Sequence, residues 1–233
     1  MKTIFKRELS AYFRSPVAYV VIGLFVLVTG LFFWLYNILS GGVYFGTTLN
    51  SAVLFLVVFA PVLTMKLFAD EKRNGTEVLL RTAPVSMLRI VLGKFLAAYA
   101  VFAIMTAITV VFPVIMAFYA KVPLPETIGA YVGFLLVGGV FISIGLFTSS
   151  ITESQIVAAI TGIVISLFTY FVSSIGVTLG GWFGSALAWL SPLDRFTDFA
   201  SGIMNFGSVI FYLSFTAVML FVTYTNLERR RWN

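Results

Sequence analysis

Six long apolar stretches constrain the fold of this 233-residue chain more than any other feature of its sequence. A bilayer core of about 30 Å is crossed by about 20 mostly apolar helical residues, and six windows meet that requirement. They are residues 17–39, 50–68, 95–119, 130–150, 156–178 and 206–225. The pattern predicts an all-α integral membrane protein with one transmembrane domain over residues 1–233. Pro61 and Pro113 fall inside two windows, where membrane helices tolerate proline, and predict kinks.

The composition narrows the classes of function. The chain is 60% hydrophobic and only 10% charged, which is far more apolar than a soluble domain. It contains no cysteine and no histidine, which argues against thiolate, imidazole and zinc-type chemistry, so we expect neither an enzyme nor a metal or cofactor site. A net charge of +6 would suggest nucleic acid in a soluble protein. Here the positions of Lys and Arg along the chain are those expected of a membrane protein, so we expect no nucleic-acid partner.

Two transport mechanisms lack their usual residues. Gly93-Lys94 has neither the upstream glycine nor the following hydroxyl of a phosphate-binding loop, so ATP would have to bind a separate subunit. Proton- or sodium-driven carriers usually hold ionisable groups near the bilayer midplane. Lys66 lies near an inner end, within reach of the interface, and a stand-alone secondary carrier is therefore disfavoured.

The distribution of Lys and Arg predicts the topology. If both termini are cytoplasmic, thirteen basic residues face inward and two, Lys121 and Arg195, face outward. The inward set is Lys2, Lys6, Arg7, Arg14, Lys66, Lys72, Arg73, Arg81, Arg89, Lys94, Arg229, Arg230 and Arg231. This bias satisfies the positive-inside rule, and an even number of spans returns the chain to the side where it began.

The N-terminal region predicts an interfacial helix over residues 1–15. Apolar residues lie on one helical arc and Lys2, Lys6, Arg7 and Arg14 provide a basic surface for anionic lipid headgroups. The same surface could also contact a cytosolic partner. A cleaved signal peptide is the alternative for a basic start before an apolar run, but its apolar region should be only 7 to 15 residues long. The first window is longer, which favours a retained span.

The connector between the second and third spans, residues 66–94, is a charged segment in an otherwise apolar chain. Asn74-Gly75 predicts a turn, and Thr76 is the expected N-cap of a short helix from 77 to about 82 that Pro84 ends. Ser86 is the expected cap of the helix that leads into the third span. Snorkelling cations alone would explain the charges but not the two short helices.

Two other connections carry capping signals. Thr152 and Gln155 have the spacing of a capping box before the fifth span, and this turn is a second candidate contact for a cytosolic partner. Residues 179–205 are apolar but broken by glycine and proline, which predicts a pair of half-inserted outer helices. Ser191-Pro192 predicts the start of one of them, and Arg195 and Asp198 have the spacing of a surface ion pair.

The connector also carries a family resemblance. Its segments EKRNGTEVLL at 71–80, APVS at 83–86 and LGK at 92–94, set between two spans and four, resemble those of permease subunits of type 2 ABC exporters. The segments SPLDRF at 191–196 and FASG at 199–202 resemble the gliding-motility-associated branch of that family. The likeness extends over nearly the whole chain.

The resemblance implies a set of partners. Two copies of such a chain, or this chain and a related one, pair in the plasma membrane, which in bacteria is the inner membrane. Each copy docks a separate ABC ATPase through a coupling helix that corresponds to residues 76–84. The N-terminal helix then flanks the ATPase, re-entrant helices precede the sixth span, and an accessory extracytoplasmic protein joins in some assemblies.

The leading hypothesis is therefore an ATP-driven permease, in which the ATPase pushes on the connector and tilts spans two and three. The expected coupling residues are Glu71, Gly75, Thr76, Glu77, Leu79, Leu80 and Pro84. Gly75 would form the turn, Thr76 would cap the helix, and the two leucines would dock into the ATPase. The alternative is a membrane scaffold that moves no solute and transmits ATPase motion to extracytoplasmic proteins. The sequence names no substrate for the first hypothesis.

Overall fold

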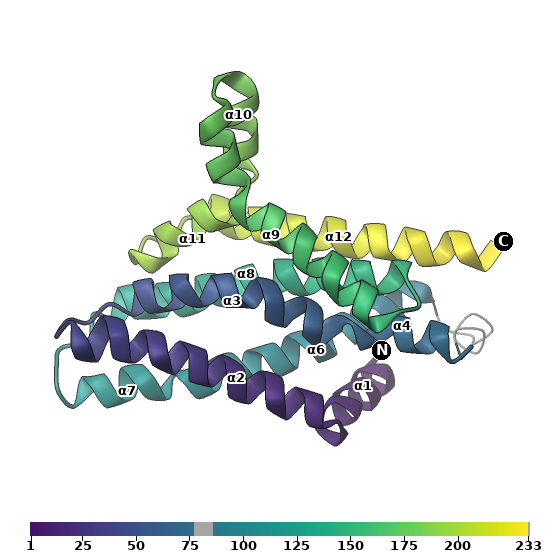
Figure 1. The fold of residues 1–233 in the computed structure, drawn as a ribbon, viewed down its shortest axis with the longest axis horizontal. Helices are drawn as coiled ribbons and strands as arrows, with labels where there is room; N and C mark the ends of the chain where they lie inside the picture. The colour runs from purple at the N-terminus through teal and green to yellow at the C-terminus, as the bar shows by residue number, and fades with distance from the viewer. Residues whose placement is uncertain (77–85, 233) are drawn as a thin grey trace.

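The computed structural model describes residues 1–76 and 86–232, and every regular element within them is a helix (Figure 1). The elements are α1 (Lys2–Arg14), α2 (Pro16–Phe33), the π-helix η1 (Trp34–Leu39), α3 (Phe45–Thr64), α4 (Lys66–Arg73), α6 (Met87–Thr109), α7 (Val111–Ala117), α8 (Leu124–Ile151), α9 (Gln155–Leu179), α10 (Gly181–Trp189), α11 (Pro192–Ala200) and α12 (Phe206–Trp232).

Six helical segments of the described chain are long and apolar enough to cross a membrane. They are Pro16–Leu39, Phe45–Arg73, Met87–Ala117, Leu124–Ile151, Gln155–Leu179 and Phe206–Arg229. The prediction of an all-α integral membrane protein with six spanning helices is confirmed. The second segment joins α3 to α4, and the third joins α6 to α7, so each contains an internal break.

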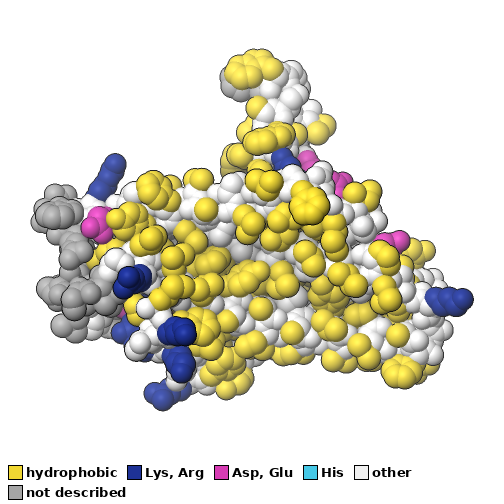
Figure 2. Space-filling model, turned by 180° about the vertical axis from the view of Figure 1, so that it is seen from behind, with side chains coloured by type: hydrophobic (Ala, Val, Ile, Leu, Met, Phe, Trp, Pro, Cys, Tyr) yellow, Lys and Arg dark blue, Asp and Glu magenta, His cyan; other side chains and the backbone are white. Residues whose placement is uncertain are grey.

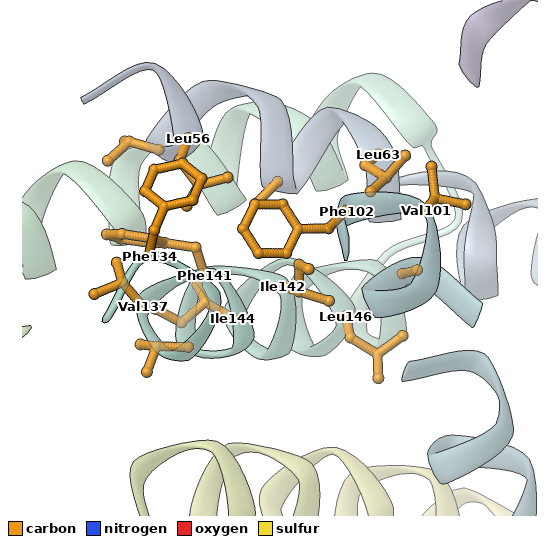
Figure 3. Packing of buried hydrophobic residues seen from close by; sticks show 14 of the residues in the cluster. Leu56, Leu63, Val101, Phe102, Phe134, Val137, Phe141, Ile142, Ile144 and Leu146 are labelled. Atoms are coloured by element: carbon orange, nitrogen blue, oxygen red, sulfur yellow. The ribbon is translucent and has the colours of Figure 1, made fainter. Parts of the chain in front are cut away.

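Helix α8 lies at the centre of the bundle. It contacts α3, α4, α6, α9, α11 and α12, and 72% of its most apolar window is buried, because it is apolar all round and has neighbours on every side. In the close view of Figure 3, Leu56 and Leu63 of α3 and Phe102 of α6 pack against Phe134 and other side chains of α8.

Glycines allow the neighbours of α8 to approach closely. A Cβ at Gly138 would overlap the Phe102 ring, and a Cβ at Gly145 would overlap Thr64 Oγ1 and lie 3.0 Å from Pro61 Cα. Lipid tails are as apolar as these side chains, so close van der Waals packing at small residues is what holds membrane helices together. Gly145 therefore determines how closely α3 and α8 pack.

The break between α6 and α7 follows from Pro113. Proline has no N–H and cannot bond to the carbonyl four residues earlier, which is that of Thr109. Tyr131 of α8 donates its hydroxyl to this carbonyl at 2.9 Å, and α6 ends at Thr109. The kink predicted at Pro113 is present, and a neighbouring helix satisfies the freed backbone group.

The segment before α12 contains two short helices, α10 and α11. Ser191 accepts a hydrogen bond from the backbone N–H of Asp194 at 3.3 Å and Pro192 occupies the first turn, which confirms the predicted start of α11. The predicted ion pair between Arg195 and Asp198 is wrong for the described structure. The Arg195 guanidinium lies 4.2 Å from the centroid of the Phe211 ring, because a cation that is partly desolvated gains more from an aromatic face here. In Figure 1 the hairpin of α9 and α10 projects from the bundle.

The surface is divided by charge. Figure 2 shows Lys and Arg gathered at the end of the molecule that carries α1 and α4, beside a long apolar flank. Helices α2 and α9 also expose apolar side chains, including Leu24, Leu27, Val164 and Phe168, which are 48–59% exposed. Such a flank is stable only against lipid or another apolar surface.

Replacing Gly145 with alanine tests the close packing of α3 on α8. We expect Gly145→Ala to lower the free energy of unfolding by about 1–3 kcal/mol, because the new methyl group collides with Thr64 and with backbone atoms of Pro61. The measurement is a denaturant titration in mixed micelles. The matched control is Gly23→Ala, where no atom lies within 4 Å and alanine favours the helix, so stability should stay equal or rise slightly. Equal behaviour of the two variants would contradict the packing argument.

Candidate coupling site at the charged end

The predicted coupling residues divide into two groups. Glu77, Leu79, Leu80 and Pro84 lie outside the described residues. Glu71 belongs to the last turn of α4, Gly75 has a φ of +68°, which favours glycine, and Thr76 donates its hydroxyl to the Glu71 carbonyl at 3.2 Å. The structure thus shows the first part of the connector, in which α4 leads to the segment that begins at Thr76.

A serine from α8 forms the junction between α3 and α4. Ser149 donates its hydroxyl to the Met65 carbonyl at 2.9 Å. The same oxygen accepts from the backbone N–H groups of Phe68 at 3.0 Å and Ala69 at 3.2 Å. In an unbroken helix the Ala69 N–H would bond to the Met65 carbonyl. The hydroxyl is inserted between the two, which is one of the established causes of a helix kink.

A buried lysine holds the other side of α4. Lys94 of α6 is 1% exposed, and its ammonium contacts Glu71 at 2.8 Å, Glu8 at 3.2 Å and the Leu67 carbonyl at 2.6 Å. Arg7 contacts the carboxylates of Glu8 at 2.8 Å and Glu71 at 3.1 Å. We refer to Arg7, Glu8, Glu71 and Lys94 as the Lys94 cluster. It joins α1, α4 and α6.

Only one of the two oxygens of the Glu71 carboxylate has partners in the cluster. Its cations converge on Glu71 Oε1, whereas Glu71 Oε2 is buried without a hydrogen-bond partner in the described residues. An unpaired buried oxygen is costly, so the carboxylate depends strongly on the Lys94 ammonium. The side-chain hydrogen bond to Glu8 raises the pKa of the Arg7 guanidinium above its usual value, and Arg7 remains charged.

Two polar contacts link α4 to α8 and α9, and a residue of α12 shares one of the acceptors. Lys72 donates to the Ser150 carbonyl, and Asp70 accepts from the side-chain amide of Gln155. Asn226 of α12 donates to the same Ser150 carbonyl at 3.3 Å and to the Ser150 hydroxyl at 3.1 Å. The polar residues of the α8–α9 connection therefore contact α4 within the chain.

The predicted capping box of Thr152 and Gln155 is wrong. Ser154 is the N-cap of α9, and its hydroxyl accepts from the Val157 N–H at 3.5 Å. Thr152 instead accepts from the Ser154 N–H at 3.2 Å. The Gln155 amide is used in the contact with Asp70, which has no local sequence signal because the two residues are far apart in the chain.

Helix α1 supplies both the exposed basic surface and a buried contact. Lys2, Lys6, Arg7 and Arg14 are exposed, and that geometry is compatible with the predicted role at a membrane surface. Tyr12 donates its hydroxyl to the Leu63 carbonyl at 2.8 Å. Burial raises the pKa of the Tyr12 phenol well above its usual value, and the Glu8 carboxylate adds to this effect. The phenol therefore stays protonated as a donor.

The prediction that the chain holds no metal site is based on its lack of cysteine and histidine. Within residues 1–76 and 86–232, no group of three or more His, Cys, Asp or Glu side chains could hold a metal ion. The arrangement is compatible with a mechanical role, because side chains join α4 to α1, α6, α8 and α9.

Six helices in the described part of the chain are long and apolar enough to cross a bilayer, and they define a class of protein, the multi-pass membrane proteins. Comparison with protein families narrows this class. Residues 2–232 match the family described as ABC-2 family transporter protein, and the chain belongs to that family. It is a permease subunit of an ABC transporter, and the family implies an ATPase partner. A comparison with curated proteins found no match.

Sequence reasoning missed the two residues that organise the site. Ser149 has no local sequence signature, because its hydroxyl bridges to another helix that is distant in the chain. Lys94 was placed at the margin of the third span, whereas it lies in the interior of α6 (Met87–Thr109). The available signal in the sequence was that Lys94 is a single lysine between two apolar stretches.

Replacing Ser149 with alanine tests the kink. We expect Ser149→Ala to lower the free energy of unfolding by about 1–3 kcal/mol, because it leaves the Met65 carbonyl without its side-chain partner. The control is Ser185→Ala, which removes an exposed hydroxyl that bonds only within its own helix. Both variants are compared by denaturant titration in mixed micelles. An equal, small effect at both positions would show that the bridge contributes nothing.

Replacing Lys94 with methionine tests the Lys94 cluster. We expect Lys94→Met to cost about 3–5 kcal/mol of unfolding free energy, because two carboxylates lose their most buried counter-ion. Adding Glu71→Gln should recover part of the loss, because Arg7 then balances the one remaining acid, Glu8. Lys121→Met, at an exposed position on the other end, is the control. Additive losses in the double variant would rule out the pairing.

Proposed function

We propose that this permease subunit works in an ATP-driven exporter and is coupled to a separate ATPase through the cytoplasmic segment 76–84. Both termini and the charged end of the bundle face the cytoplasm of a plasma membrane, in bacteria the inner membrane. Export is the direction that the connector's resemblance to type 2 exporters implies. The outer segments at 191–196 and 199–202 favour the gliding-motility-associated branch.

The observation that supports this proposal best is the attachment of α4. A partner that pushes on the connector displaces α4 first, since Asn74 and Gly75 follow directly after its last residue. The Ser149 bridge and the Lys94 cluster then transmit the displacement to α8, α1 and α6. If α4 lacked these contacts, a displacement of the connector would not be transmitted to the other helices.

The pairing of two subunits follows from the same proposal. A path between two copies, or between this chain and a related one, would open when the displaced helices tilt. The apolar flank seen in Figure 2 offers the surface that such a pairing needs, in addition to lipid. The permease itself carries out no bond chemistry, and ATP is hydrolysed in the partner.

A second candidate function is a scaffold that transmits ATPase motion to extracytoplasmic proteins without moving a solute. The projecting α9–α10 hairpin supports it, because Trp182 and Trp189 are 73% and 68% exposed there and could dock an accessory protein. The discriminating observation is a structure of the paired complex. A substrate-sized cavity between the copies supports transport, and tightly packed spans with a large outer docking face support the scaffold.

The docking role of the connector is tested with Leu79→Asp and Leu80→Asp together. We expect the double variant to lose copurification of the ATPase from the coexpressed operon, because two charged groups cannot enter an apolar cleft without a large desolvation cost. The ATPase turnover that the permease stimulates should fall accordingly. Leu124→Asp is the matched control, since Leu124 is 65% exposed at the opposite end of the bundle. Unchanged copurification and turnover in the double variant would exclude this docking role.

A further inference from the structure

A cavity of about 330 Å³ lies at the elbow between α1 and α2, next to the Lys94 cluster. Figure 1 shows α1 turning back from the start of α2 at the end that also carries α4. The turn is made by Ser15, whose hydroxyl accepts from the Val17 N–H at 3.4 Å, and by Pro16 in the first turn of α2. The walls come from α1, α2, α3, α4 and α6.

An apolar groove continues from this cavity along the lipid-facing side of the bundle. It is lined by Pro16, Val17, Val20, Val21 and Leu24 of α2 and by Val58, Phe59 and Val62 of α3. Val17 and Val62 line both spaces, so the groove lies directly beside the cavity. From Val17 to Leu24 the groove follows α2 for about 10 Å at the helical rise of 1.5 Å per residue.

The charges of the cavity select the polar end of a ligand. Its walls carry the acids Glu8, Asp70 and Glu71 and the bases Lys66 and Lys94. Lys94 is fully engaged by the cluster, whereas the half-buried Lys66 has no hydrogen-bond or ion-pair partner among the described residues. Lys66 is therefore free to bind a phosphate. Glu8 and Glu71 are already paired with Arg7 and Lys94, whereas Asp70 has no cation partner among the described residues and its carboxylate accepts only from the Gln155 amide. Asp70 therefore disfavours a second anionic group and favours an ammonium.

We propose that this elbow binds one phospholipid with an ethanolamine headgroup, with its phosphate on Lys66, its ammonium on Asp70, and one acyl chain in the groove between α2 and α3. A cavity that carries charged groups, beside a fully apolar groove, matches the polarity of such an amphiphile. The lipid would brace α1 against α2 and α4, which are the elements around the coupling site. The inference does not depend on what the transporter moves.

The test measures lipid retention by the full-length chain after purification and delipidation in detergent. Phosphatidylethanolamine, phosphatidylcholine and phosphatidylglycerol with identical acyl chains are titrated separately, and bound lipid is counted by native mass spectrometry. We expect one tightly bound ethanolamine lipid per chain. Choline has no N–H to donate, and the loss of hydrogen bonds to charged groups should weaken its binding by about tenfold.

Two variants test the headgroup end and the acyl-chain end of the site separately. Lys66→Gln removes the phosphate partner and Val20→Trp fills the groove, and each should weaken ethanolamine-lipid binding by about tenfold. Val20 is 57% exposed, so the larger side chain leaves the fold intact. The controls are Lys121→Gln and Val164→Trp, the latter at a valine that is 59% exposed on α9.

Specific outcomes overturn the proposal. Equal retention of the three headgroups, or preference for phosphatidylglycerol, would exclude an ethanolamine site. Wild-type binding by Val20→Trp would show that the retained lipid lies elsewhere on the apolar flank. Loss of ATPase docking with normal lipid binding would leave this inference intact, so its failure can be distinguished from failure of the proposed function.

Discussion

The constraint on which this structure depends is that backbone groups in a bilayer must find partners inside the protein. Where a spanning helix breaks, a side chain of α8 supplies the missing partner. Tyr131 does so for the Thr109 carbonyl at the end of α6, and Ser149 does so for Met65 and Ala69 between α3 and α4. Both breaks are therefore defined by contacts with the central helix, and the second one directs α4 towards the connector.

The contacts around α4 explain how a short amphipathic helix at the end of a bundle can transmit force to other helices. Surface ion pairs contribute little to stability, but Lys94 is almost completely buried, where loss of its charge leaves its partners uncompensated. Polar contacts to Ser150 and Gln155 hold the opposite side of α4. A force applied to the connector therefore meets a packed unit that includes five other helices, which is what a coupling role requires.

Local signals predicted those elements whose formation is local. The interfacial pattern of residues 1–15 corresponds to α1, the Ser191-Pro192 pair starts α11, and Pro113 coincides with a break. The capping box at Thr152 and Gln155 failed because Gln155 binds Asp70, 85 residues away. The Arg195–Asp198 pair failed because the guanidinium packs against the Trp189 and Phe211 rings and donates to the Trp189 carbonyl. Residues 77–84 of the predicted coupling helix, 76–84, lie outside the described residues.

The sequence by itself determined that the chain is a helical membrane protein with six spans, since the length and apolarity of each span are local properties set by the thickness of the bilayer. It also determined the family, through the connector that separates two spans from four. Only the tertiary structure decided that Lys94 is a buried counter-ion and that Ser149 completes the backbone of α3 and α4. Such contacts join residues that are distant in the chain, and they exist only when the helices pack closely enough for one side chain to reach another helix's backbone.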